Sequence, residues 1–189
     1  ALAYGRTEEE VQTLESLTEQ LYRGCINLKL FEYSEVDLQL LKKAAKVYAI
    51  GEYIELDSSS QHTFYLISNQ SIPGMSHINR VKLALLASYK NRDYFLRFAR
   101  PFDSWISKEE FKKLRDFGAI LKFVYAMNMT KRNVVKNIAI EKVNNQFHIE
   151  VLTSERAIAE MAQAEKQKKH IERVFKGDVK LNFKEERQG

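Results

Sequence analysis

The sequence is poor in the residues that mark several common protein classes. It has a single cysteine, Cys25, so it cannot form an internal disulfide or a thiolate metal cluster, and we expect a reducing compartment, the cytoplasm. Its seven glycines are scattered, which excludes a glycine-rich phosphate loop. No apolar run approaches the roughly 18 residues of a membrane-spanning helix, so we expect no membrane partner.

The sequence does have enough apolar residues for a core, and its charge is unevenly distributed. Hydrophobic residues make up 44% of the 189 residues, which predicts one folded domain, or one with a small addition. The segment from Tyr89 to Arg132 holds eleven basic and five acidic residues, an excess larger than the net charge of +5 of the whole chain. Such a segment either attracts polyanions or forms a solvated helix face.

Helical periodicity dominates the first two thirds of the chain. Ser107 and Glu110 form a capping box that opens the last helix of this part. We expect Gly24 to end the first helix, and the short aromatic stretch 62–68 carries no predicted helix. Apolar residues recur at intervals of three and four in four segments, which predicts helices over 7–24, 36–50, 77–89 and 107–129.

The period changes to two after Arg132. Apolar and polar residues alternate over 138–141 and 147–151, which predicts two strands joined by a turn at Asn144-Asn145. A helix over 157–175, capped by Thr153 or Ser154 and stopped by Gly177, and a strand over 179–183 complete a ββαβ pattern. We therefore predict a mainly α fold, with a helical domain over residues 1–130 and a small C-terminal α+β subdomain over residues 131–189.

Residues capable of catalysis or metal binding are present, but not in a pattern that predicts a site. No serine lies in a Gly-x-Ser-x-Gly turn, and Cys25 lies among apolar residues, so we expect it to be structural. None of the histidines has a spacing that would place two ligands on one metal ion; these are His62, His77, His148 and His170. The sequence therefore predicts no catalytic residue and no metal site.

Several stretches follow one another in a recognisable order. Residues 43–51 are Lys-Ala-Ala-Lys-Val-Tyr-Ala-Ile-Gly, residues 62–67 are His-Thr-Phe-Tyr-Leu-Ile, and residues 72–75 are Ile-Pro-Gly-Met. They resemble the Ala-Ala-x-Leu-His-x-Ile-Gly, His-Ser-x-Tyr-Ile-Leu and Pro-Gly-Phe motifs of the exopolyphosphatase and guanosine pentaphosphate phosphohydrolase family. Tyr89-Lys90-Asn91 takes the place of its Tyr-His-Arg motif, and residues 120–128 resemble its Leu-Leu-Arg-x-Ala-x-Ala-Leu-Asp helix.

The resemblance spans essentially the whole chain, but only the C-terminal part of the family's proteins. It fits a chain that lacks an initiator methionine, which we expect to be a fragment of a longer protein. It implies an HD-like helical domain, related to metal-dependent HD phosphohydrolases, with altered ligand positions. Glu10 stands in place of the first histidine, Tyr48 and Ala49 replace the His-Asp pair, and Asn128 replaces the final aspartate. These side chains do not form a divalent-ion site.

The same resemblance implies what the chain does. In the family, catalysis belongs to N-terminal actin-like domains of the same polypeptide, which use Mg. We therefore expect this chain to hold no cofactor, to be inactive alone as a hydrolase, and to form interdomain contacts or a homodimer. Its expected role is to bind and guide inorganic polyphosphate, and the candidate binding residues are His62, Lys90, Arg92, Lys131 and Arg132.

Two other functions remain open. A nucleic-acid binding module would stack bases on aromatic residues that alternate with arginines, and the candidates are Phe95, Phe98, Phe102 and Trp105 beside Arg97 and Arg100. A purely structural interaction domain would instead dock an acidic partner on the basic segment.

Overall fold

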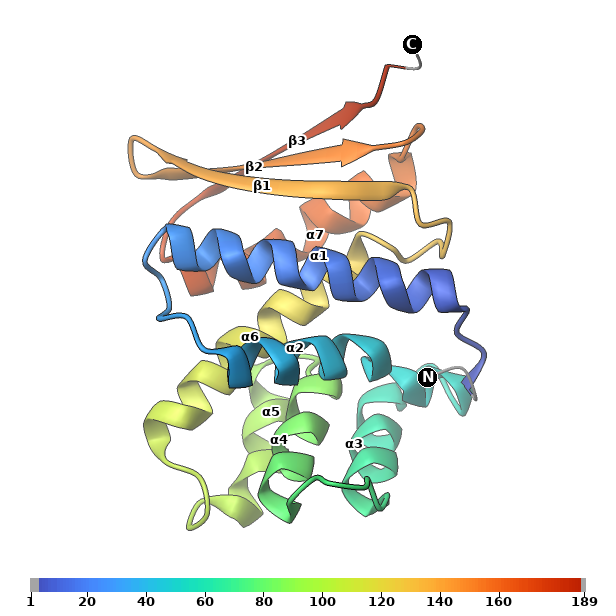
Figure 1. The fold of residues 1–189 in the computed structure, drawn as a ribbon, viewed down its shortest axis with the longest axis vertical. Coiled ribbons are helices and arrows are strands. Elements are labelled where there is room, and N and C mark those ends of the chain that lie inside the picture. Colours follow the sequence, from blue (N-terminus) through green and yellow to red (C-terminus); the bar gives the residue numbers. More distant parts are fainter. Residues whose placement is uncertain (1–3, 188–189) are drawn as a thin grey trace.

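The computed structural model describes residues 4–187 as layers of helices with a three-stranded sheet at one end (Figure 1). Its elements are α1 (Glu8–Asn27), α2 (Glu35–Val47), the 3-10 turn η2 (Ile50–Tyr53), α3 (Ser59–Asn69), α4 (His77–Ala87), α5 (Arg92–Ala99), the 3-10 turn η3 (Arg100–Phe102), α6 (Lys108–Ala126), β1 (Val135–Val143), β2 (Gln146–Thr153), α7 (Ile158–Phe175) and β3 (Val179–Glu185). This confirms the mainly α fold with a small ββαβ part at its C-terminal end.

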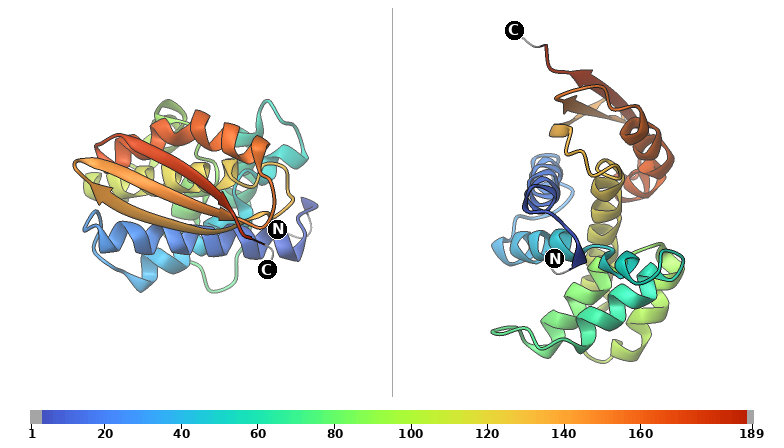
Figure 2. Two further views of the ribbon diagram at one scale, coloured as in Figure 1. Left: turned by 90° about the horizontal axis from the view of Figure 1, so that it is seen from above. Right: turned by 90° about the vertical axis from the view of Figure 1, so that its right-hand side faces the viewer.

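The sheet has the order β1-β2-β3 and lies over α1 and α7 (Figures 1 and 2). β1 and β2 pair in an antiparallel manner through a tight turn, and β2 and β3 pair in parallel, with α7 as the crossover. Asn144 and Asn145 have φ angles of 48° and 64°, the left-handed conformation that a two-residue hairpin turn of this type requires. The predicted hairpin is therefore confirmed at these two residues.

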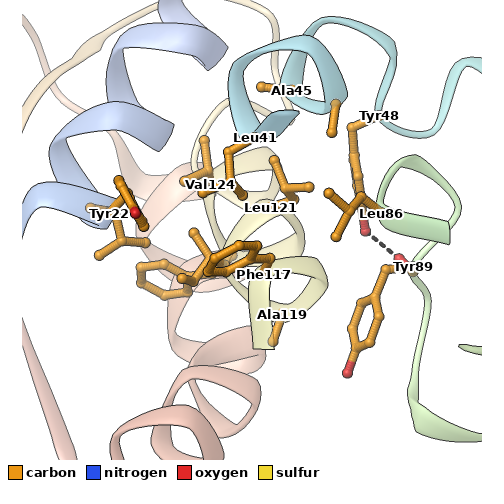
Figure 3. Close-up of a cluster of buried hydrophobic side chains, with 14 of the residues drawn as sticks. Tyr22, Leu41, Ala45, Tyr48, Leu86, Tyr89, Phe117, Ala119, Leu121 and Val124 are labelled. Carbon is orange, nitrogen blue, oxygen red and sulfur yellow. Dashed lines mark hydrogen bonds between the residues drawn. The ribbon is translucent and has the colours of Figure 1, made fainter. Parts of the chain in front are cut away.

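Helix α6 is the centre of the fold and contacts α1, α2, α4 and α7. The Ser107 hydroxyl accepts a hydrogen bond of 3.1 Å from the backbone N–H of Glu110, which fixes the start of the helix. Its apolar residues are buried almost all round; Phe117, Leu121 and Val124 pack among side chains of α1, α2 and α4 (Figure 3). Because α6 is buried on several sides, it fixes the positions of the helices that surround it.

Two expectations about helix ends are wrong. Gly24 does not end α1, which continues to Asn27; a Cβ at this glycine would lie 2.9 Å from Cδ1 of Ile140 in β1, so the glycine allows the sheet to pack closely on the helix. Helix α7 is not capped by Thr153 or Ser154, because β2 runs to Thr153 and the N-cap residue is Ala157, whose side chain cannot accept a hydrogen bond.

Two short helices were not predicted at all. Helix α3 covers the aromatic stretch around His62, and α5 lies inside the basic segment.

No helix within residues 4–187 is long and apolar enough to cross a membrane. The division into residues 1–130 and 131–189, whose outermost ends lie outside the described residues, stays a prediction.

Candidate functional site

Glu10 and Tyr48, two of the positions that the family resemblance identifies as altered metal-ligand positions, are joined by a buried arginine. The guanidinium of Arg6 donates hydrogen bonds to the backbone carbonyl oxygens of Lys46, at 2.8 Å, and of Tyr48. Its Nε lies 3.5 Å from Oε1 of Glu10, and both side chains of this ion pair are buried. Glu10 and Tyr48 are therefore close together, with a cation of the protein between them.

The other altered positions also have partners within the protein. Asn128 and Asn133 are bound twice, by an amide–amide hydrogen bond of 2.9 Å and by the backbone N–H of Asn133 donating to the Asn128 side chain at 3.0 Å. Ala49 has no ligand atom in its side chain, and its N–H donates to the carbonyl oxygen of Ala87. These residues do not fit a divalent ion, and within residues 4–187 no group of three or more His, Cys, Asp or Glu side chains could hold one.

A pocket of about 300 Å³ opens beside Tyr48, between the end of α4, the C-terminal half of α6 and α7. Two lysines line it, Lys90 after α4 and Lys122 on α6, and we call it the lysine pocket. The ammonium group of Lys122 donates a hydrogen bond to the carbonyl oxygen of Lys90, and Nζ of Lys90 lies 4.9 Å from the centre of the Tyr94 ring. Both lysines are thus held at the same opening.

The positive charge at this pocket exceeds the negative charge, because two lysines and one carboxylate line it. Burial and, to a smaller extent, the charges of Lys169, Lys90 and Lys166 together lower the pKa of Lys122 to about 8. The carboxylate that lines the pocket, Glu52, accepts a hydrogen bond from the Tyr125 hydroxyl. An anion that enters the pocket would offset the repulsion between these lysines and stabilise the charged form of Lys122.

The five sequence candidates do not form one site. Lys90 lines the lysine pocket, and Arg92 lines a neighbouring pocket on the same side of α6 and α7. His62 lies on α3, with Nε2 at 3.4 Å from a carboxylate oxygen of Glu55, and it does not line the described pockets.

The last two candidates follow α6. Arg132 donates to both carboxylate oxygens of Glu160, at 3.0 and 3.1 Å, and Glu160 is fully buried. This bidentate pair gives Arg132 a structural task, since the buried carboxylate needs a cation. The neighbouring Lys131 is exposed and has a left-handed backbone, φ 59°. Lys131 and His62 as ligand residues stay predictions.

The sequence reasoning missed the contribution of α7. Lys166, Lys169 and Arg173 follow one another at intervals of three and four residues, so they lie along one face of the helix. The signal was present in the sequence, but it lies outside the basic segment that ends at Arg132. Lys122 belongs to that segment, and only the packing of α6 against α7 distinguishes it from the other lysines.

The aromatic residues of the nucleic-acid hypothesis mostly pack inside the protein. Phe95 is buried, and Phe98 stacks on Phe64 with ring centres 4.7 Å apart. Phe102 packs edge-on against His77 and Trp105, and of the four rings Trp105 is the most exposed, at 52%. Three of the four rings are therefore not available as a base-stacking platform.

Cys25 is buried, as expected for a structural cysteine. Burial raises the pKa of its thiol to about 12, with a smaller contribution from the carboxylate of Asp116. The thiol therefore stays protonated and unreactive at neutral pH.

Comparison with protein families gives one match over most of the chain. Residues 9–169 match the family model described as Ppx/GppA phosphatase, domain III. A search of curated proteins found no match.

Proposed function

The chain belongs to the Ppx/GppA phosphatase family, as a domain III of that family, and on this premise we propose that it binds inorganic polyphosphate at the lysine pocket and along the basic side of α6 and α7. In this role it holds a polyanionic chain for the catalytic, actin-like domains of the same enzyme. Contacts with those domains and with a second copy of the chain belong to the same proposal.

The observation that supports this proposal most is the meeting of lysines from three parts of the chain. Lys90, Lys122 and Lys169 come from the α4–α5 turn, α6 and α7, and the charges of Lys90 and Lys169 help burial to lower the pKa of Lys122. Polyphosphate carries about one negative charge per phosphate, so several lysines along a surface bind it by releasing counterions, without any base or side chain to recognise.

Nearby acids on α7 are occupied elsewhere. Glu165 pairs with Lys168, and the carboxylate of Glu172 accepts a hydrogen bond of 3.1 Å from the backbone N–H of Val179. Among residues 4–187, neither carboxylate forms an ion pair with Lys166 or Lys169. The basic side of α6 and α7 therefore keeps its charge for a ligand.

A titration with long-chain polyphosphate and with single-stranded RNA, each at low and moderate salt, tests the proposal. We expect polyphosphate to bind more tightly than RNA and to lose affinity steeply with salt. The variant Lys90→Gln/Lys122→Gln/Lys169→Gln should bind at least tenfold more weakly. The matched control removes the same number of charges from three exposed lysines of the sheet, Lys136→Gln/Lys142→Gln/Lys180→Gln, and should bind as the unchanged chain does.

Three outcomes would contradict the proposal. Equal losses in the two sets of variants would mean that only net charge matters. RNA binding that is tighter than polyphosphate binding and is removed by Trp105→Ala would favour the nucleic-acid alternative. Binding to neither polymer would favour a structural interaction domain.

The altered HD-like positions lead to a further expectation about activity. Since Glu10 is paired with Arg6 and Asn128 with Asn133, we expect no phosphohydrolase activity from this chain alone, with or without added Mg or Mn. The measurement is phosphate release from polyphosphate, and activity that co-purifies with the chain and survives Tyr48→Phe and Asn128→Ala would point to a catalytic centre elsewhere in it.

A further inference from the structure

A second pocket, of about 350 Å³, lies next to the lysine pocket and shares Tyr89 with it. Three arginines line it from three elements: Arg92 at the start of α5, Arg115 on α6 and Arg173 on α7. We call it the arginine pocket. Asp116 is the acidic residue of its lining, so the arginines leave an excess of positive charge at the opening. Convergent guanidinium groups favour a tetrahedral oxyanion, which they bind through several parallel N–H groups.

His170 forms the inner wall of the arginine pocket. The residue is only 5% exposed, and its ring packs edge-on against Tyr89, with ring centres 6.4 Å apart. Its Nδ1 is buried and has no hydrogen-bond partner among the described residues. A buried polar atom without a partner costs free energy, so the protein tolerates here a group that its own contacts do not satisfy.

Burial and positive charge together keep this imidazole neutral. Burial, with smaller contributions from the charges of Lys122, Lys169 and Arg173, lowers the pKa of His170 to about 4. Charged or titratable groups act on the ring or line the same pocket from each packed element: Arg115, Asp116 and Lys122 from α6, Lys169 and Arg173 from α7, Tyr89 before α5 and Arg92 at its start.

Asp116 does not change this balance. Burial raises the pKa of its carboxyl group, although Arg115, Lys112 and Lys176 oppose the shift. One carboxylate against three arginines in the lining still leaves an excess of positive charge beside His170.

We propose that the arginine pocket is a distinct site for one doubly charged tetrahedral oxyanion, a phosphoryl group, and that His170 takes up a proton from solvent when this anion binds. The anion offsets the repulsion from the surrounding cations, so the imidazolium becomes stable and can donate a hydrogen bond. The proposal rests on the proposed function only for the nature of the ligand, since free phosphate and the end of a polyphosphate chain present the same group.

The test uses sulfate, which keeps two negative charges over the whole pH range of interest, and NMR of the ring protons of the four histidines. We expect sulfate to move the titration midpoint of His170 from about 4 towards the ordinary value of about 6.5, and to bind more than tenfold more tightly at pH 5 than at pH 7.5. Chloride at equal ionic strength, and the midpoints of His62, His77 and His148, serve as controls.

The exposed Arg173 provides the variant, because its replacement leaves the core intact. Arg173→Gln should abolish the sulfate effect on His170, whereas Lys180→Gln should retain it. Sulfate binding without a shift of His170, or equal shifts of all four histidines, would overturn the proposal.

Titrations with orthophosphate and with tripolyphosphate then separate the two sources of the ligand. The source is the compound that saturates the shift of the His170 midpoint at the lower concentration, and either result supports the site. Failure here is distinguishable from failure of the proposed function. Long-chain polyphosphate that binds while His170 does not respond would overturn the arginine pocket alone. A response to sulfate without polyphosphate binding would overturn the polyphosphate proposal alone.

Discussion

The hydroxyl group of Tyr48 donates a hydrogen bond of 2.5 Å to the backbone carbonyl oxygen of Tyr89 (Figure 3). Burial raises the pKa of Tyr48 well above its ordinary value, with help from Tyr125, Tyr89 and Glu52, so the hydroxyl remains a donor. The bond ties the end of α2 to the residue that precedes Lys90. A position where the family resemblance places a histidine thus holds the backbone of the lysine pocket.

Tyr48→Phe should destabilise the fold by about 1–2 kcal/mol, because the buried carbonyl oxygen of Tyr89 loses its partner while the packing of the ring is kept. Urea unfolding measures the change. Tyr65→Phe, at a tyrosine that is 67% exposed, is the control and should be neutral. Equal stabilities of the two variants would mean that the Tyr48–Tyr89 bond contributes nothing.

Gly118→Ala should destabilise the fold by about 1–3 kcal/mol, although alanine is the better helix former. A Cβ at this position of α6 would lie 2.5 Å from Cδ2 of Tyr89 and 2.8 Å from its Cβ, so the ring must shift. We also expect weaker polyphosphate binding, since Lys90 follows Tyr89. Gly24→Ala brings its Cβ against the flexible end of the Ile140 side chain, so it should destabilise the fold less than Gly118→Ala. A larger loss for Gly24→Ala in thermal unfolding would contradict this.

The charge of Lys122 should make polyphosphate binding depend on pH. Burial and neighbouring lysines lower its pKa to about 8, so the folded chain loses this proton at lower pH than the unfolded chain, whose lysine pKa is about 10.4. Its destabilising charge is therefore fully present below pH 8 and disappears as the pH rises through 8. Polyphosphate favours the charged amine, so its affinity should fall over the same range.

Lys122→Gln isolates this effect. Its affinity for polyphosphate should be lower than that of the unchanged chain at pH 7, and the difference should shrink towards pH 9.5. Titrations at constant ionic strength measure it, with Lys180→Gln as the control. A difference that stays constant over this range would show that Lys122 does not titrate there.

Arg132→Gln should cost about 1–2 kcal/mol of stability, less than for a fully buried pair, because Arg132 is 42% exposed. Burial raises the pKa of Glu160, but hydrogen bonds from Thr130 and Arg132 outweigh it and hold the pKa below its usual value. The contribution of this pair is therefore present above about pH 4.5 and lost at lower pH. Lys131→Gln is the control and should leave the free energy of unfolding in urea unchanged. An equal loss of stability in both variants would refute a specific role of Arg132.

Much of the fold follows from local signals in the sequence. The capping box at Ser107 and Glu110 marks the start of α6, and Asn144-Asn145 marks the hairpin, because each depends on residues a few positions apart. Gly24 shows where such reasoning ends. As a local signal, glycine favours the end of a helix. Here the glycine leaves room for the side chain of Ile140, more than a hundred residues later, and no local pattern reveals that contact.

The candidate site was predictable only in part for the same reason. Lys90 and Arg92 were found from charge and from a family motif, and both line pockets on the basic side of α6 and α7. Lys122 and His170 are functional candidates because of burial and of charges on another helix, which are properties of the packed structure. The pairing of Arg132 with Glu160 could not be read from the sequence, because the two residues lie 28 positions apart.

The contact between α1 and the sheet has a consequence for how the chain folds. The side-chain oxygen of Gln20 accepts a hydrogen bond of 2.8 Å from the backbone N–H of Ile138, a residue 118 positions later. Closing a loop of that length is slow compared with forming helices such as α6 from neighbouring residues. During synthesis on the ribosome, α1 emerges more than a hundred residues before β1, so we expect its sheet-facing side to stay exposed during that interval and to be a surface that needs a chaperone.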